Sequence, residues 1–205
     1  MITAREATQR LQQGNQRFVS GIKDNDSFVK QLQREDVLDG QAPFAIILGC
    51  SDSRVPAEII FDQGLGDLFV IRVAGNIVAP SQIGSVEFAA KQFGTPLVVV
   101  LGHSMCGAVI ATLEEIQRPS DEKSSNVLSI VRRIQPSVEL LLETDLGNDP
   151  ERLLKAAIRS NILASTSNLM HGSQMLEQLV LDDRLAIVAA EYSLETGVVE
   201  FITDV

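Results

Sequence analysis

The sequence predicts an α/β fold with a mostly parallel central sheet of about four strands, an antiparallel edge strand and flanking helices. Short apolar runs typical of buried strands alternate with amphipathic segments typical of helices, which is the pattern of parallel crossover units. The last apolar run follows its predecessor across a short turn, which favours an antiparallel pair at one edge. With 205 residues and 45% hydrophobic content, the chain is long enough for one domain with a full core.

The first half of the chain is expected to hold two helices and three strands. Ala4–Ser20 has apolar residues on roughly one face, and residues 21–40 are polar, with at most a helical turn or two around Val29–Leu32. The predicted strands are Phe44–Gly49, Leu68–Val73 and Leu97–Gly102, with a helix at Ser81–Phe93 between the last two. This strand–helix–strand order implies a right-handed parallel crossover.

The second half is expected to be mainly helical before it returns to the sheet. Pro136 is expected to break or kink one helix, and Pro150 suits the first position of the next, after Asn148 or Asp149 as N-cap. No repeat or interdomain linker interrupts the pattern, so residues 1–205 are predicted to form one domain. The expected segments are helices at Ala108–Ile116, Val127–Thr144 and Pro150–Leu181, a loop at Arg118–Asn126, a strand at Arg184–Ala190 and the antiparallel edge strand at Gly197–Thr203.

Composition narrows the classes of partner and compartment. The formal net charge of −10 argues against nucleic acid and anionic membranes as partners. No apolar run approaches the roughly 20 residues of a spanning helix, and the N-terminus has no apolar signal-peptide region. The expectation is a cytoplasmic protein, where the two cysteines are less suited to a disulfide than to another use.

Both cysteines and one of the two histidines follow predicted strands. Cys50 comes directly after the first apolar run, and the run from His103 to Cys106 comes directly after the third. In open α/β folds the carboxyl ends of strands build the site. Two thiolates and one imidazole suit tetrahedral Zn²⁺ with a fourth position open, as in catalytic zinc sites.

Other uses of these residues have to be weighed against zinc. A lone His-x-x-Cys pair is a weak signal, and buried cysteines are commonly small core hydrophobes. A Cys50–Cys106 redox switch is a further alternative. The coincidence of all three side chains at strand ends favours metal, whereas His171, beside Gly172 and Ser173, fits a solvated or capping residue better.

Asp52 and Arg54 lie just beyond Cys50, and an Asp-x-Arg pair alone is most often a salt bridge that stabilises a loop. Beside a metal ligand, a functional pair is favoured, because Arg54 can hold the carboxylate by a bidentate hydrogen bond. Asp52 would then either orient a zinc-bound hydroxide or occupy the open metal position itself.

These runs resemble the β-class carbonic anhydrases over essentially the whole chain. Weaker matches lie at residues 11–18 and 192–201. The runs that carry the resemblance are Cys50-Ser51-Asp52-Ser53-Arg54, Arg72-Val73-Ala74-Gly75-Asn76, Gly84-Ser85-Val86-Glu87-Phe88-Ala89 and Gly102-His103-Ser104-Met105-Cys106-Gly107-Ala108.

The resemblance implies a zinc enzyme that reversibly hydrates carbon dioxide to bicarbonate and a proton by zinc-bound hydroxide. It implies Cys50, His103 and Cys106 as ligands, the Asp52–Arg54 pair as catalytic, and a homodimer or homotetramer. It also implies a narrow apolar cleft at the dimer interface and an N-terminal arm, residues 1–40, that packs on a partner subunit. The residues that it assigns to the substrate are Gln41, Phe69, Ala74, Phe88 and Gly107.

Two positions depart from patterns found in this family. Phe88 stands where some relatives carry Tyr, and Ile47 stands where some bacterial relatives carry the Trp of an allosteric bicarbonate pocket. Relatives that hydrolyse carbonyl sulfide or carbon disulfide share the metal runs, so that activity stays open as an alternative. A non-catalytic zinc protein is the other alternative, and the Asp52–Arg54 pair argues against it.

Overall fold

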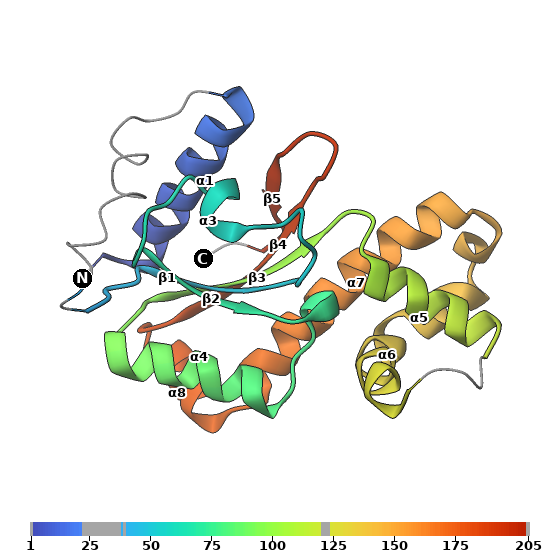
Figure 1. The fold of residues 1–205 in the computed structure, drawn as a ribbon. Coiled ribbons are helices and arrows are strands. Elements are labelled where there is room, and N and C mark those ends of the chain that lie inside the picture. Colours follow the sequence, from blue (N-terminus) through green and yellow to red (C-terminus); the bar gives the residue numbers. More distant parts are fainter. Residues whose placement is uncertain (1, 22–37, 39, 120–123, 204–205) are drawn as a thin grey trace.

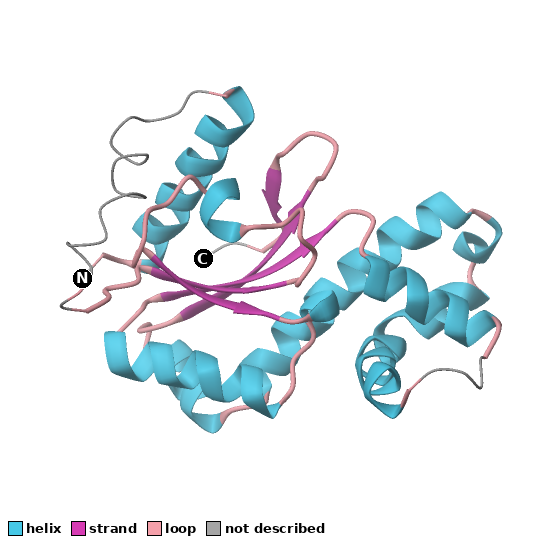
Figure 2. Ribbon diagram, in the orientation of Figure 1, coloured by secondary structure: helices cyan, strands magenta, loops and turns pink. Residues whose placement is uncertain are grey.

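A five-stranded sheet with helices on both faces forms the centre of the protein (Figures 1 and 2). The computed structural model describes residues 2–21, 38, 40–119 and 124–203. The strands are β1 (Ala45–Gly49), β2 (Leu68–Arg72), β3 (Leu97–His103), β4 (Ala186–Tyr192) and β5 (Val199–Phe201). Their order in the sheet is β2-β1-β3-β4-β5.

The pairing of the strands confirms the predicted fold class. β1 pairs in parallel with β2 and β3, and β3 pairs in parallel with β4. β5 is the antiparallel edge strand beside β4. Because β2 lies on one side of β1 and β3 on the other, the strand order reverses at β1. The carboxyl ends of β1 and β3 therefore form the switch point at which open α/β sheets build their sites.

Helix α1 (Ala4–Ser20) covers one face of this chain's own sheet, together with the short α3 (Ala57–Ile60). Thr3 and Glu6 form a capping box at its start. Asn15 connects α1 to the segment at the start of β5. Its side-chain amide donates to Gly197 O at 2.9 Å and accepts from Val199 N at 2.9 Å. The contact of this arm with a partner subunit stays a prediction, and the helical turn expected near residues 29–32 lies outside the described residues.

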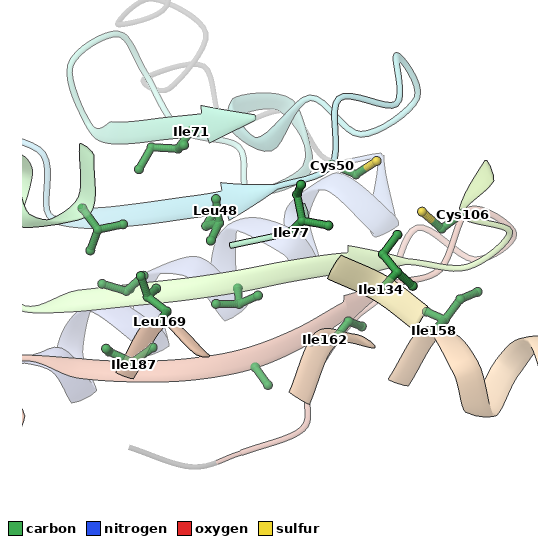
Figure 3. Packing of buried hydrophobic residues seen from close by; sticks show 14 of the residues in the cluster. Leu48, Cys50, Ile71, Ile77, Cys106, Ile134, Ile158, Ile162, Leu169 and Ile187 are labelled. Atoms are coloured by element: carbon green, nitrogen blue, oxygen red, sulfur yellow. The ribbon is translucent and has the colours of Figure 1, made fainter. Parts of the chain in front are cut away.

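Larger helices cover the opposite face. At the end of the sheet, α5 (Gly107–Gln117) and α6 (Ser125–Val138) form a helical lobe with the first part of α7 (Pro150–His171) (Figure 1). Among the described residues, none of the helices combines the length and apolar character that crossing a bilayer requires. The core of this face includes Leu48, Ile71, Leu169 and Ile187 (Figure 3). The helices are α4 (Pro80–Phe93), α5 (Gly107–Gln117), α6 (Ser125–Val138), α7 (Pro150–His171) and α8 (Gln174–Leu181), with 3₁₀ turns η2 (Ala74–Asn76), η3 (Glu139–Glu143) and η4 (Asp145–Asn148).

Two helical predictions are wrong in their boundaries. The predicted helix Pro150–Leu181 is two helices, because the Ser173 hydroxyl accepts a hydrogen bond from Leu176 N and starts α8 with a new cap. The predicted helix Val127–Thr144 begins earlier, at Ser125, so the loop expected at Arg118–Asn126 ends sooner. It passes through Pro136 and ends at Val138, where η3 takes over.

Candidate metal centre

The three predicted ligands meet at the carboxyl ends of β1 and β3. Cys50 follows β1, His103 is the last residue of β3, and Cys106 is the N-cap of α5. Their ligand atoms lie within 4.8 Å of one another, and the residues are 5%, 0% and 1% exposed, respectively. In Figure 3 the two sulfur atoms lie near each other beyond the end of β1. The structure therefore brings the predicted set together in a buried position.

The turn between β3 and α5 fixes how His103 is presented. Met105 adopts the left-handed backbone conformation (φ 56°), which closes the turn and brings Cys106 back toward the histidine. His103 Nδ1 lies 2.8 Å from Ser104 O. Since a carbonyl only accepts, Nδ1 carries a proton, which leaves Nε2 as the nitrogen available to a metal ion. Nε2 is buried without a hydrogen-bond partner, as expected of an atom that would bind a metal ion.

The two thiols and the imidazole lie close enough to shift one another's pKa. The Cys106 thiol is the main cause that lowers the pKa of Cys50, and the His103 ring and the Gly75 N–H lower it further. The pKa of Cys106 is raised, because its proton is held by Cys50 and because it is buried. Burial opposes charge on His103, but the neighbouring Cys50 thiolate outweighs it and raises its pKa. A Cys50 thiolate that these neighbours stabilise is suited to binding a cation.

Asp52 is held beside the ligands by Arg54. Arg54 Nε donates to Asp52 Oδ1 at 2.9 Å, and Nη2 donates to Oδ2 at 2.7 Å. The Arg54 guanidinium holds the pKa of the Asp52 carboxyl well below its usual range. Asp52 Oδ2 lies 3.9 Å from His103 Nε2, the nitrogen that would face the metal. An ionised carboxylate therefore stands at the edge of the ligand set.

Arg72 supports the same loop from the edge strand β2. Its Nε donates to the carbonyl oxygen of Cys50 at 2.9 Å, and its Nη2 donates to the carbonyl oxygen of Asp52. These bonds fix the backbone on both sides of Ser51. The sequence assigns no role to Arg72, although it lies in one of the runs that carry the family resemblance.

The predicted substrate residues fall into two groups. Ala74 lies in η2, next to the Gly75 N–H that contacts Cys50 Sγ, and Gly107 follows Cys106 directly. Phe69 belongs to the second group. It pairs with Ile46, which lies four residues before Cys50, so Phe69 is about 13 Å from Cys50 along the strand direction.

The second group lies at the other end of the sheet from the metal ligands of the same chain. Phe69 packs with Phe88 at 6.2 Å between ring centroids, and Phe88 is 55% exposed. Gln41 is exposed and precedes β1, whereas Cys50 follows it. Within one chain the structure does not bring these three side chains to the ligand set.

A cavity of about 680 Å³ opens beside the ligand turn, with Arg54, Ser104 and Met105 among its lining residues. Glu191 of β4 and Lys155 of α7 also line it. Burial raises the pKa of Glu191, although Arg159 Nε lies 3.4 Å from its Oε2. The turn that carries Cys106 thus has solvent access on the side of the C-terminal strands.

Known proteins with similar sequences and structures identify the family of the chain. A family model described as carbonic anhydrase matches residues 45–199. Carbonic anhydrase 2 of Mycobacterium tuberculosis is 39% identical over 93% of this chain and 89% of its own length. A carbonic anhydrase of Mycolicibacterium smegmatis is 38% identical over 95% of this chain and 91% of its own.

The solved structures identify the class of carbonic anhydrase. The β-carbonic anhydrase CcaA superposes with a TM-score of 0.76 and 27% identity, covering 98% of this chain and 93% of its own. A tetrameric β-carbonic anhydrase of Sordaria macrospora shares the fold, with a TM-score of 0.70 and 23% identity over 91% of this chain and 97% of its own. The chain therefore belongs to the β-carbonic anhydrase family.

Proposed function

We propose that Cys50, His103 and Cys106 bind one Zn²⁺ ion and that this centre reversibly hydrates carbon dioxide to bicarbonate and a proton. The observation that carries the proposal is the ligand geometry. Three soft or borderline donor atoms lie within 4.8 Å of one another, and one of them, His103 Nε2, is buried without a partner. These three residues would hold the ion and leave room for water beside it, as in catalytic zinc sites.

Bound zinc would act as a Lewis acid that lowers the pKa of a coordinated water and so supplies a nucleophile near neutral pH. Asp52 Oδ2 would accept a hydrogen bond from the reacting water and orient that water toward the substrate carbon. Arg54 would hold Asp52 ionised and in place. The positive end of the α5 helix dipole, at Gly107, would stabilise the negative charge that develops on the product.

The apolar part of the cleft would be completed by a second copy of the chain, in a homodimer or homotetramer. Gln41, Phe69 and Phe88 lie away from the ligands of their own chain, and Phe88 is exposed. In a two-fold dimer each chain would lend these side chains to the other's metal site. A small uncharged substrate such as carbon dioxide suits an apolar cleft of this kind.

Mixing two inactive variants tests this arrangement. Gln41→Ala would damage the site of the partner, and Cys106→Ser would damage the site of its own chain. Unfolding and refolding the two together should restore carbon dioxide hydration, because each mixed dimer would contain one intact site. Activity no higher than that of the separate variants would show that the cleft is built within one chain.

We propose that the enzyme works in the cytoplasm. Both cysteines are free in the structure and serve as candidate ligands, which suits a reducing compartment. The acidic net charge of −10 gives no attraction to anionic membrane surfaces. Cell fractionation of the native host tests this location, and recovery of the protein with secreted or membrane fractions would overturn it.

Stopped-flow hydration of carbon dioxide tests the reaction itself. The purified protein should hydrate carbon dioxide and lose that activity on Cys106→Ser. The same preparation should turn over carbonyl sulfide and carbon disulfide much more slowly. Faster turnover of either sulfur compound than of carbon dioxide would assign the site to a hydrolase instead.

A further inference from the structure

A buried asparagine of α7 touches the backbone next to the candidate metal centre. Asn161 is 2% exposed and lies between Ile158 and Ile162, which belong to the apolar core. Its Nδ2 donates to the carbonyl oxygen of Gly75 at 2.9 Å, across 86 residues of sequence. A polar side chain at a core position of a helix is costly unless it is paired, so this bond accounts for its place there.

Gly75 in turn contacts a ligand atom. Its N–H donates to Cys50 Sγ at 3.4 Å, in a buried position. Gly75 adopts the left-handed backbone conformation (φ 69°), and a Cβ at this position would lie 2.8 Å from Ile134 Cδ1. Gly75 is therefore held between the sulfur of Cys50 on its N–H and the amide of Asn161 on its carbonyl.

The same turn of α7 supports the strand that carries the histidine. A Cβ at Gly102, the residue before His103, would lie 2.3 Å from Ile162 Cγ1, so helix and strand are in close contact there. Figure 3 shows Ile158 and Ile162 on α7 on the side of the core where Cys106 lies. Two adjacent residues of α7 thus lie against the backbone beside the ligands: Asn161 contacts Gly75, which contacts Cys50, and Ile162 lies against Gly102, which precedes His103.

We propose that Asn161 is a positioning residue that keeps the Gly75 N–H on the Cys50 sulfur and thereby limits the negative charge that this thiolate gives to the metal. The inference rests on the proposed metal centre. A hydrogen bond to a ligating sulfur withdraws electron density from it, and outer groups of this kind tune the ion as well as orient its ligands. Without Asn161, the Gly75 carbonyl is unpaired and the turn is free to rotate its N–H away.

The hydrogen bond can be observed directly in the unaltered protein loaded with ¹¹³Cd²⁺ in place of zinc. The Gly75 amide proton should show scalar coupling to the cadmium nucleus through the sulfur of Cys50. Cadmium uptake without that coupling would overturn the inference and leave the metal centre intact. Failure of the protein to take up cadmium, cobalt or zinc would overturn the proposed centre itself.

Asn161→Leu tests the role of the side chain, because it keeps the branched shape and removes the donor. The variant should bind zinc about 10–100-fold more weakly in competition with a chelator, because the turn beside Cys50 is no longer held in place. Its cobalt form should show the sulfur-to-metal charge-transfer band at longer wavelength, since the thiolate is richer in electrons. Asn161→Ser is a second variant, with a shorter donor, and is expected to change both properties in the same direction.

Thr166→Val is the matched control on the same helix. Its hydroxyl donates to Ile162 O within α7 and does not reach the ligand turn. It should lower the melting temperature without moving the charge-transfer band or the zinc affinity. A band and an affinity that stay the same in both Asn161 variants as in Thr166→Val would show that Asn161 has only a packing role.

Discussion

Arg54 holds Asp52 by two parallel hydrogen bonds, one to each carboxylate oxygen, at 2.9 and 2.7 Å. The backbone N–H of Arg54 adds a third, to Oδ1, at 3.0 Å. A carboxylate with this many donors stays ionised and keeps its orientation. Its Oδ2 therefore faces His103 Nε2 as a fixed acceptor, even in the absence of any bound group.

Replacing Asp52 by Asn should slow hydration by about 100-fold, because the fixed acceptor is lost while the ligands remain. Zinc content should not change. Asp67→Asn is the matched control, since Asp67 pairs with Arg10 at 2.8 Å away from the site. Stopped-flow measurements give the hydration rate constants across pH, and the zinc content is measured in the same samples. Together they test the role of Asp52. Equal rates in the two variants would remove Asp52 from the reaction.

Replacing Arg72 by Met should weaken zinc binding and lower the hydration rate together. The change removes the donors to the carbonyl oxygens of Cys50 and Asp52 and frees the loop between them. Arg72→Lys should recover little, because one ammonium group does not match two donors in a planar fork. Arg17→Met is the control, since Arg17 contacts Asp62 in a similar way away from the ligands. Chelator competition should separate Arg72→Met from this control, and similar zinc affinities would contradict the proposed clamp.

Glu191→Gln should change how stability depends on pH. Burial raises the pKa of Glu191 in the folded protein, so its ionisation opposes folding. The wild type should therefore have its full stability below the ordinary glutamate pKa of about 4.3 and lose part of it as the pH rises through the higher folded value.

Urea unfolding at several pH values measures this effect. The free energy of unfolding of the wild type should fall relative to that of Glu191→Gln as the pH rises. Glu200→Gln, which removes the other acidic partner of Arg159, controls for the loss of a charge beside that arginine. A constant difference between wild type and Glu191→Gln over the whole range would contradict the prediction.

Removing the metal should expose both thiols and destabilise the fold. The two cysteines are buried at strand ends, where a bound ion would tie β1 to the β3–α5 turn. Thiol titration should find both cysteines masked in the native enzyme and both reactive after chelation, with a lower melting temperature. Thiols that react alike before and after chelation would favour the view that they are packing residues.

The ligand set could be predicted because it depends on local sequence. Cys50 and His103 each end a short apolar run, and parallel strands bring such ends to one edge of the sheet. The order of the strands adds that this edge lies at the switch point. The antiparallel edge strand followed from the short turn before it.

The supporting residues could not be predicted, because their partners are distant in sequence. Asn161 sits in an apolar helical pattern that gives no sign of its bond to Gly75. The break at Ser173 was missed, since the helical periodicity continues across it and only the cap shows where α8 starts. The position of Phe69 relative to Cys50 depends on the register of β2 against β1.

X-ray absorption at the zinc K-edge of the purified enzyme identifies the atoms that bind the metal. We expect two sulfur atoms at about 2.3 Å, one imidazole nitrogen at about 2.0 Å and one further light atom. Conversion of both cysteines to serine should abolish the sulfur scattering together with carbon dioxide hydration. A zinc ion with no sulfur ligand in an enzyme that still hydrates carbon dioxide would show that Cys50 and Cys106 do not form the catalytic centre.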